Sequence, residues 1–208
     1  CEEILHRFPL EAGLSPSWSL VSDAAQRVLL QDAFNKLINS PSEDPKVLNA
    51  FMHIVGRVSE TYMTDLLGIL SAQYKQFFQV KDLVKYRKYF IDTTKDYLNI
   101  TNVPSVDFDV EKLKKIVKIA TEEQNDAKKP AKHLNDIINL TNQYIDTTVD
   151  FEKYKTAYLT AEGGIKSTVS KKDYLLGEAR RVYELNQYNA NKLLFEDSVA
   201  LFDLSAAF

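Results

Sequence analysis

The sequence predicts an all-α protein made of three long, kinked antiparallel helices that follow one shorter helix. Three observations support this fold class. Apolar residues recur at helical spacing over long stretches, few stretches alternate in the way a half-buried strand requires, and only six glycines and six prolines interrupt 208 residues. The 45% hydrophobic content is enough for a sizeable core.

The longest predicted helix covers residues 108–161. From Val110 to Thr148, apolar or small residues repeat every three or four positions, which is the heptad pattern of a coiled coil. A helix of this length would span about 80 Å and must be covered lengthwise by other long helices. The pattern resumes in phase after Pro130, so we expect a proline kink there rather than a break. Glu162-Gly163-Gly164 is expected to end the helix.

The remaining helices are predicted from their stop and start signals. A shorter helix is expected at 19–38 after a loop at 1–16, and Asp44 is expected to cap the next helix with Pro45 at its first position. That helix, at 46–98 with room for slack at Gly56 and Gly68, is aromatic-rich on more than one face and should pack against two partners. The last helix is expected at 171–208, after a segment, Ser170 to Asp173, that resembles a capping box.

Composition excludes several classes of protein. The net charge of −3 argues against a generally basic nucleic-acid binder, and no apolar run approaches the roughly 18 residues needed to cross a bilayer. The single cysteine, Cys1, excludes an internal disulfide and fits a reducing compartment. A leading cysteine could also carry the lipid of a bacterial lipoprotein, although a fragment of a longer chain is the favoured explanation.

No residue pattern predicts catalysis. His6, His53 and His133 are far apart, and Asp146 and Asp150, four apart on one predicted helix face, have no histidine or metal partner. The Gly163 to Thr168 segment resembles a phosphate loop only superficially, because it follows a helix and lacks the first glycine. We therefore expect neither an enzyme nor a metal or cofactor site.

Seven lysines are the candidate site residues. Four of them project within about 40° of a single line along the predicted 108–161 helix, and three more cluster at the turn after it. They either keep the hydrophobic seam soluble or bind an anionic partner such as phospholipid headgroups. The seven are Lys114, Lys118, Lys128, Lys132, Lys166, Lys171 and Lys172.

Short motifs carry a resemblance to a known family. Val149-Asp150-Phe151-Glu152, then Leu193-x-x-Glu196 and Leu201-Phe202-Asp203, resemble steps in the second and third helices of BAR (Bin/amphiphysin/Rvs) domains. The resemblance covers residues 46–208. It implies a curved dimeric helical bundle that binds and remodels membranes.

The N-terminal part, residues 1–45, adds a second resemblance. The stretch from Gln26 to Phe34, the segment from Asn39 to Pro45, and Val47-Leu48-x-x-Phe51 are similar to the closing helix of a phosphoinositide-binding PX domain, as in sorting nexins. Residues 1–45 would then be a PX-domain tail. The alternative is an amphipathic leader, for which its charge balance is poor.

The resemblance implies a cytoplasmic scaffold, peripheral on endosomal membranes, that binds or shapes curved anionic membranes in endosomal or endocytic protein transport. A homodimer or heterodimer is expected, with no nucleic-acid partner. The alternatives are a helical-bundle scaffold for protein–protein interaction, or a secreted helical surface factor, neither with a lipid role.

Overall fold

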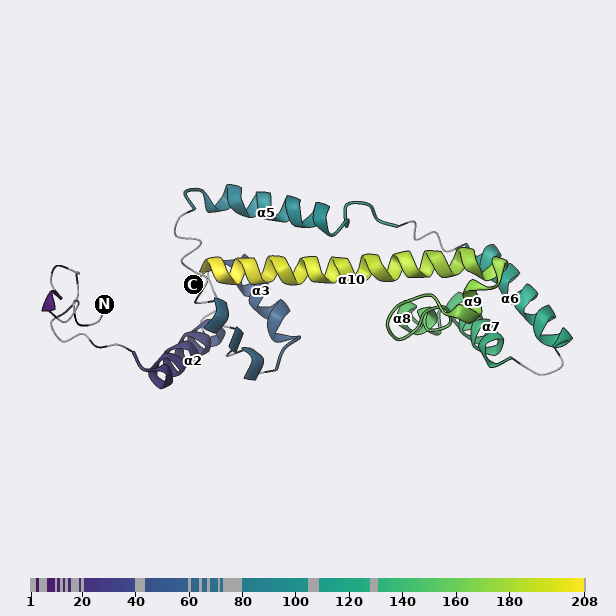
Figure 1. Cartoon of the computed structure of the whole chain (residues 1–208), viewed down its shortest axis with the longest axis horizontal. Coiled ribbons are helices and arrows are strands. Elements are labelled where there is room, and N and C mark those ends of the chain that lie inside the picture. The colour runs from purple at the N-terminus through teal and green to yellow at the C-terminus, as the bar shows by residue number, and fades with distance from the viewer. Residues whose placement is uncertain are drawn as a thin grey trace. The chain divides into compact units, whose positions relative to one another are not determined.

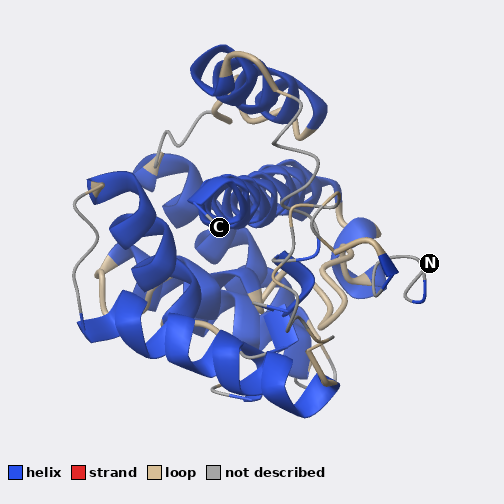
Figure 2. Cartoon of the chain, turned by 90° about the vertical axis from the view of Figure 1, so that its left-hand side faces the viewer, coloured by secondary structure: helices blue, strands red, loops and turns tan. Residues whose placement is uncertain are grey.

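The computed structural model describes residues 21–39, 44–59, 61–63, 65–66, 68–70, 72, 80–104, 109–127 and 131–207, together with 3, 7–9, 11, 13, 15 and 19. In this part of the chain every named element is a helix, and the β-type pairing is an isolated bridge between Leu159 and Ile165 (Figure 2). The all-α class is confirmed. The helices, labelled as in Figure 1, are α2 (Asp23–Asn39), α3 (Pro45–Val55), α5 (Leu83–Tyr97), α6 (Val110–Asp126), α7 (Lys132–Ile145), α8 (Phe151–Lys155), α9 (Ser167–Ser170) and α10 (Asp173–Ala207).

The chain divides into two compact units. Unit 1 comprises residues 1–87 and 197–208, and unit 2 comprises residues 88–196. Helices α5 and α10 contribute to both units, because the divisions fall after Arg87 and after Glu196. The boundary predicted after residue 45 stays a prediction.

Helix α3 in unit 1 begins as predicted. The Asp44 side chain accepts a hydrogen bond from the Lys46 backbone N–H at 2.8 Å, and Pro45 occupies the first position. Because proline lacks an N–H and has a fixed φ, that position suits it. The start signal predicted from these two residues is therefore confirmed.

The continuous helix predicted at 46–98 is wrong. Helix α3 ends at Val55 with Gly56 as its C-cap, and α5 begins only at Leu83. In a straight helix Phe51 and Leu70 would lie about 28 Å apart. Both belong to one buried cluster, together with Ala200 and Leu204 of α10. Folding the chain back lets one core bury apolar residues that a straight helix would spread along its length.

The single helix predicted at 108–161 is also wrong, because α6 ends at Asp126, α7 begins only at Lys132, and both helices pack into one core. Leu113 of α6 and Leu140 of α7 would be about 40 Å apart in one helix, yet they pack into the same core cluster. The backbone of Ala127 is extended, with ψ 131°, and the Ala131 N–H donates to Gln124 Oε1 at 3.1 Å. Residues 128–130, with the kink predicted at Pro130, lie outside the described residues.

A second interruption follows α7 and ends it at Ile145. The Thr148 N–H donates to the Gln143 carbonyl at 2.9 Å and the Thr147 N–H to the Tyr144 carbonyl at 3.1 Å, which is the pattern of a Schellman motif. Thr147 adopts the left-handed conformation with φ 55°, where glycine is usual. Asp150 then caps α8 by accepting from the Lys153 N–H. The predicted common helix face of Asp146 and Asp150 therefore does not form.

Two tyrosines fill the centre of the unit 2 core. Tyr154 and Tyr158 are fully buried, and the Tyr154 ring stacks on Tyr144 with 4.1 Å between ring centroids. The Tyr158 hydroxyl lies 3.2 Å from the hydroxyl of buried Thr141. The core also includes residues of α6, α9 and α10, chiefly Leu113, Ile116, Val169, Leu175, Ala179 and Val182.

The predicted last helix is confirmed as α10, and two local predictions near it need correction. Gly163 is left-handed, with φ 83°, but it closes the turn between Leu159 and Ile165 and not a long helix. The capping box predicted at Ser170 is wrong, because the Ser170 hydroxyl donates backward to the Ser167 carbonyl within α9.

We predict that Thr147→Gly raises the free energy of unfolding by about 1 kcal/mol, because glycine adopts the left-handed conformation without the cost that a β-branched residue incurs. Urea denaturation would measure it. Thr148→Gly is the matched control: it should lower the stability, because it removes the bond from the Thr148 hydroxyl to the Gln143 carbonyl. Destabilisation by Thr147→Gly would instead favour the uninterrupted helix.

Candidate functional site

The seven candidate lysines do not form one stripe. Lys114 and Lys118 lie on α6 and Lys132 begins α7, and the chain reverses between these helices. The straight line on which their alignment depended therefore does not exist. Lys114, Lys118 and Lys132 are exposed, and Lys114 pairs with Glu111 at 3.0 Å. Lys128 lies outside the described residues.

The lysines predicted to cluster at the turn have different surroundings. Lys171 is exposed at the end of α9. Lys166 donates to the Thr156 carbonyl at 2.5 Å, and Lys172 pairs with Glu123 of α6. Lys166 and Lys172 thus hold parts of unit 2 together, which leaves them less able to contact a headgroup. A membrane role for the seven lysines stays a prediction.

A cavity of about 420 Å³ lies between α6 and α10 in unit 2. Its apolar lining comes from isoleucines of α6 and from a tyrosine and a glycine of α10, and its charged lining is mostly cationic. This composition is typical of small-molecule sites, which are largely apolar with a few polar groups. The lining residues are Lys112, Lys115, Ile116, Ile119, Tyr174, Gly177, Glu178 and Arg181.

Glu178 carries the best-connected carboxylate of this region. It accepts from the Tyr154 hydroxyl at 2.8 Å and from Arg181 Nε and Nη2 at 2.9 and 2.5 Å, and its side chain is 8% exposed. The carboxylate raises the pKa of Arg181 through these hydrogen bonds. Burial raises the pKa of Tyr154, so its phenol stays protonated and remains a donor. The guanidinium at the cavity wall is therefore fixed in position and permanently charged.

Glu123 links α6 to the start of α10. Its two carboxylate oxygens accept from Lys172 Nζ and from the Tyr174 hydroxyl, the latter at 2.8 Å. These bonds, the lysine bond first, lower the pKa of Glu123. Burial, with a further contribution from the bond to Glu123, raises the pKa of Tyr174. Because Tyr174 is held at its hydroxyl end, its position beside the cavity is constrained.

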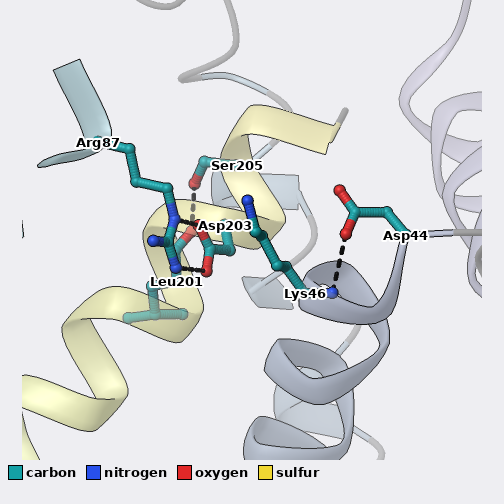
Figure 3. A network of polar contacts seen from close by, with 6 residues as sticks. All are labelled: Asp44, Lys46, Arg87, Leu201, Asp203 and Ser205. Atoms are coloured by element: carbon teal, nitrogen blue, oxygen red, sulfur yellow. Dashed lines mark hydrogen bonds and ion pairs between the residues drawn. The ribbon is translucent and has the colours of Figure 1, made fainter. Parts of the chain in front are cut away.

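A second cavity of about 420 Å³ lies in unit 1 and is electrically balanced. Arg87 donates to both oxygens of Asp203 at 2.6 Å, and Figure 3 shows the Lys46 side chain extending toward this pair. The bidentate bond to Asp203 raises the pKa of Arg87. The two cations of the lining face two carboxylates, Asp203 and Asp44, so this cavity has no surplus charge for a ligand.

His53, one of the three histidines of the sequence, has a described side-chain contact in unit 1. His53 Nε2 lies 2.8 Å from Asp197, which Arg57 also contacts at 3.0 Å, so this histidine belongs to an ion-pair cluster of unit 1. Among the described residues, no group of three or more histidine, cysteine or acidic side chains is arranged to hold a metal ion. Within the same residues, no helix is both long and apolar enough to span a bilayer.

Sequence reasoning missed the residues that build the α6–α10 cavity. Glu178 and Arg181 are three apart on one helix, a spacing at which opposite charges meet, and that signal was available. The contacts between Glu123 and Tyr174 join positions 51 residues apart, for which no local signal exists.

No protein-family model, curated protein or solved structure matches this chain. The resemblance to BAR and PX domains accordingly stays a prediction.

We predict that the contribution of Glu123 to stability falls as the solution becomes acidic. Its folded pKa lies below its unfolded value near 4.5, so the contribution is fully present above that pH and disappears as pH falls through the folded pKa. Glu123→Gln should cost about 0.5–1 kcal/mol at pH 7 and progressively less below pH 4.5. Thermal unfolding from pH 7 to 3 measures the difference.

Glu122→Gln is the matched control for this pH series, because Glu122 is an exposed neighbour on the same helix. Its difference from the unchanged chain should be small at every pH. A difference for Glu123→Gln that stays constant down to pH 3 would contradict the assigned role of Glu123.

Proposed function

We propose that the chain is a helical protein-interaction module, and that unit 1 carries a binding surface for an apolar patch on a protein partner. This is the second of the functions that the sequence suggested. The observation that carries the proposal is that α3 has two apolar stripes, of which the unit 1 core covers one.

The first stripe of α3 faces the core. Ala50, Phe51 and Ile54 are buried there at 4–5% exposure, with Val47 packed beside them. This i, i+3, i+4, i+7 spacing is the usual pattern of a helix with one face in a core.

The second stripe has the same helical spacing, and its two more exposed side chains have no matching cover among the described residues. Leu48, Met52 and Val55 follow i, i+4, i+7 spacing. Leu48 is half-buried, whereas the exposed fraction is 62% for Met52 and 38% for Val55. The apolar face of α3 is therefore wider than the part that the core covers, and apolar residues of a helix normally face a packing partner. The uncovered stripe therefore indicates a surface that a partner covers.

A protein partner fits this stripe better than a lipid surface does. Interfacial helices oppose their apolar face with a strongly charged face rich in lysine and arginine. Helix α3 instead has its core stripe beside the exposed one, and Lys46 is the only lysine or arginine within its bounds. Two well-exposed apolar side chains on a short helix also bury little area in a bilayer.

The test combines partner capture with a lipid control. A photo-crosslinking residue at Met52, introduced into the chain in its native cells, should give discrete protein adducts, a second copy of the chain among the possible ones. The same residue at exposed Asn49 is the matched control, since Asn49 lies on the polar side of α3. The double variant Leu48→Gln/Val55→Gln should reduce the Met52 adducts at least fivefold while circular dichroism remains unchanged.

The membrane-scaffold hypothesis is tested in the same material. Co-sedimentation with phosphatidylserine vesicles should show no binding above that with phosphatidylcholine vesicles. Binding to the anionic vesicles that Lys114→Glu/Lys118→Glu/Lys132→Glu abolishes would favour the membrane scaffold instead. Equal adduct patterns at Met52 and Asn49 would overturn the protein-interaction proposal.

A further inference from the structure

We propose that the cavity between α6 and α10 binds a small aromatic anion, meaning a flat apolar body that carries a carboxylate, sulfonate or phosphate. The site lies in unit 2 and shares no residue with the α3 surface, so it neither rests on the proposed interaction nor fails with it.

The charge of the cavity favours an anion. Arg181 and Glu178 neutralise each other through a bidentate contact, which leaves Lys112 and Lys115 as the surplus cations of the lining. Lys112 contacts Asp109 at 3.3 Å in an exposed, solvent-screened pair. Lys115 has no ion-pair partner among the described residues. Its ammonium is available to a ligand.

The apolar side of the cavity favours a flat body. Ile116 and Ile119 line it from α6, while the Tyr174 ring, held through its hydroxyl by Glu123, lines it from α10. An anchored aromatic ring beside apolar side chains suits stacking with an aromatic ligand. The volume of about 420 Å³ lies within the usual range for small-molecule sites.

Gly177 supplies an independent observation. It lies inside α10, where glycine is less favourable than alanine, and its φ is not in the left-handed region. A Cβ built at this position would meet no atom within 4 Å, so packing does not require glycine here. Because Gly177 lines the cavity, the missing side chain keeps that space open for a ligand.

The experiment uses two probes that differ only in charge. 8-Anilinonaphthalene-1-sulfonate carries a sulfonate, and N-phenyl-1-naphthylamine has the same aromatic body without it. Fluorescence titration of the purified chain should show one saturable site with at least tenfold higher affinity for the sulfonate. Gly177→Leu, which fills the cavity, should weaken both probes at least tenfold. Lys112→Glu/Lys115→Glu should weaken only the sulfonate.

Controls separate the cavity from general charge and from misfolding. Lys118→Glu/Lys132→Glu changes the same number of charges outside the lining and should leave both affinities unchanged. The methyl resonances of Ile116 and Ile119 in the unchanged chain should shift when the sulfonate binds, which tests the location without any variant. Unshifted isoleucine methyls, or equal loss with the control pair, would overturn the proposal.

Discussion

The hydrogen bond from the buried Tyr154 hydroxyl to Glu178 is the contact on which unit 2 depends. The Tyr154 ring stacks on Tyr144 of α7 and its hydroxyl donates to Glu178 of α10, so one side chain of the short helix α8 joins two longer helices. A buried phenol needs a partner, and a buried carboxylate needs a cation. Arg181 supplies that cation within the same helix. Each group is therefore satisfied only when the others are in place.

The need to bury these aromatic side chains explains why α6 and α7 fold back instead of continuing as one long helix. Their apolar faces meet around Tyr158, which is fully buried and lies beside the hydroxyl of Thr141. One long helix would leave each face to be covered by another long helix. The folded-back arrangement buries both faces against the first part of α10, and the cavity forms where α6 passes the glycine of that helix.

The lysines of unit 2 fall into two groups according to their bonding partners. Lys166 and Lys172 bond to groups inside unit 2, whereas Lys115 lines a cavity without an ion-pair partner among the described residues. Sequence alone treats these lysines alike, since each is a cation near an apolar seam. What distinguishes them is the neighbour that the tertiary structure brings within bonding distance. Function is therefore better argued from the cavity and from the uncovered stripe of α3 than from a count of lysines.

Local chemistry in the sequence determined the helical class, the start of α3 and the extent of α10. Asp44 and Pro45 set the first turn of α3 through one hydrogen bond and one fixed φ, both within three consecutive residues. Asn99 likewise ends α5 in the left-handed conformation, close to the predicted end at residue 98. Such signals act within four residues and can be recognised in the sequence.

Only the tertiary structure decided where the long apolar patterns are interrupted. A heptad pattern is the same whether one helix or two folded-back helices carry it, because each must bury the same face. Thr147 gives no local sign of its left-handed conformation, which follows directly after the helix whose Tyr144 stacks on Tyr154. The cavity forms only because α6 and α10 meet. The bond between Glu123 and Tyr174, which joins these regions, links positions 51 residues apart. The physical reason is that periodicity specifies which face is buried, while distant contacts specify what buries it.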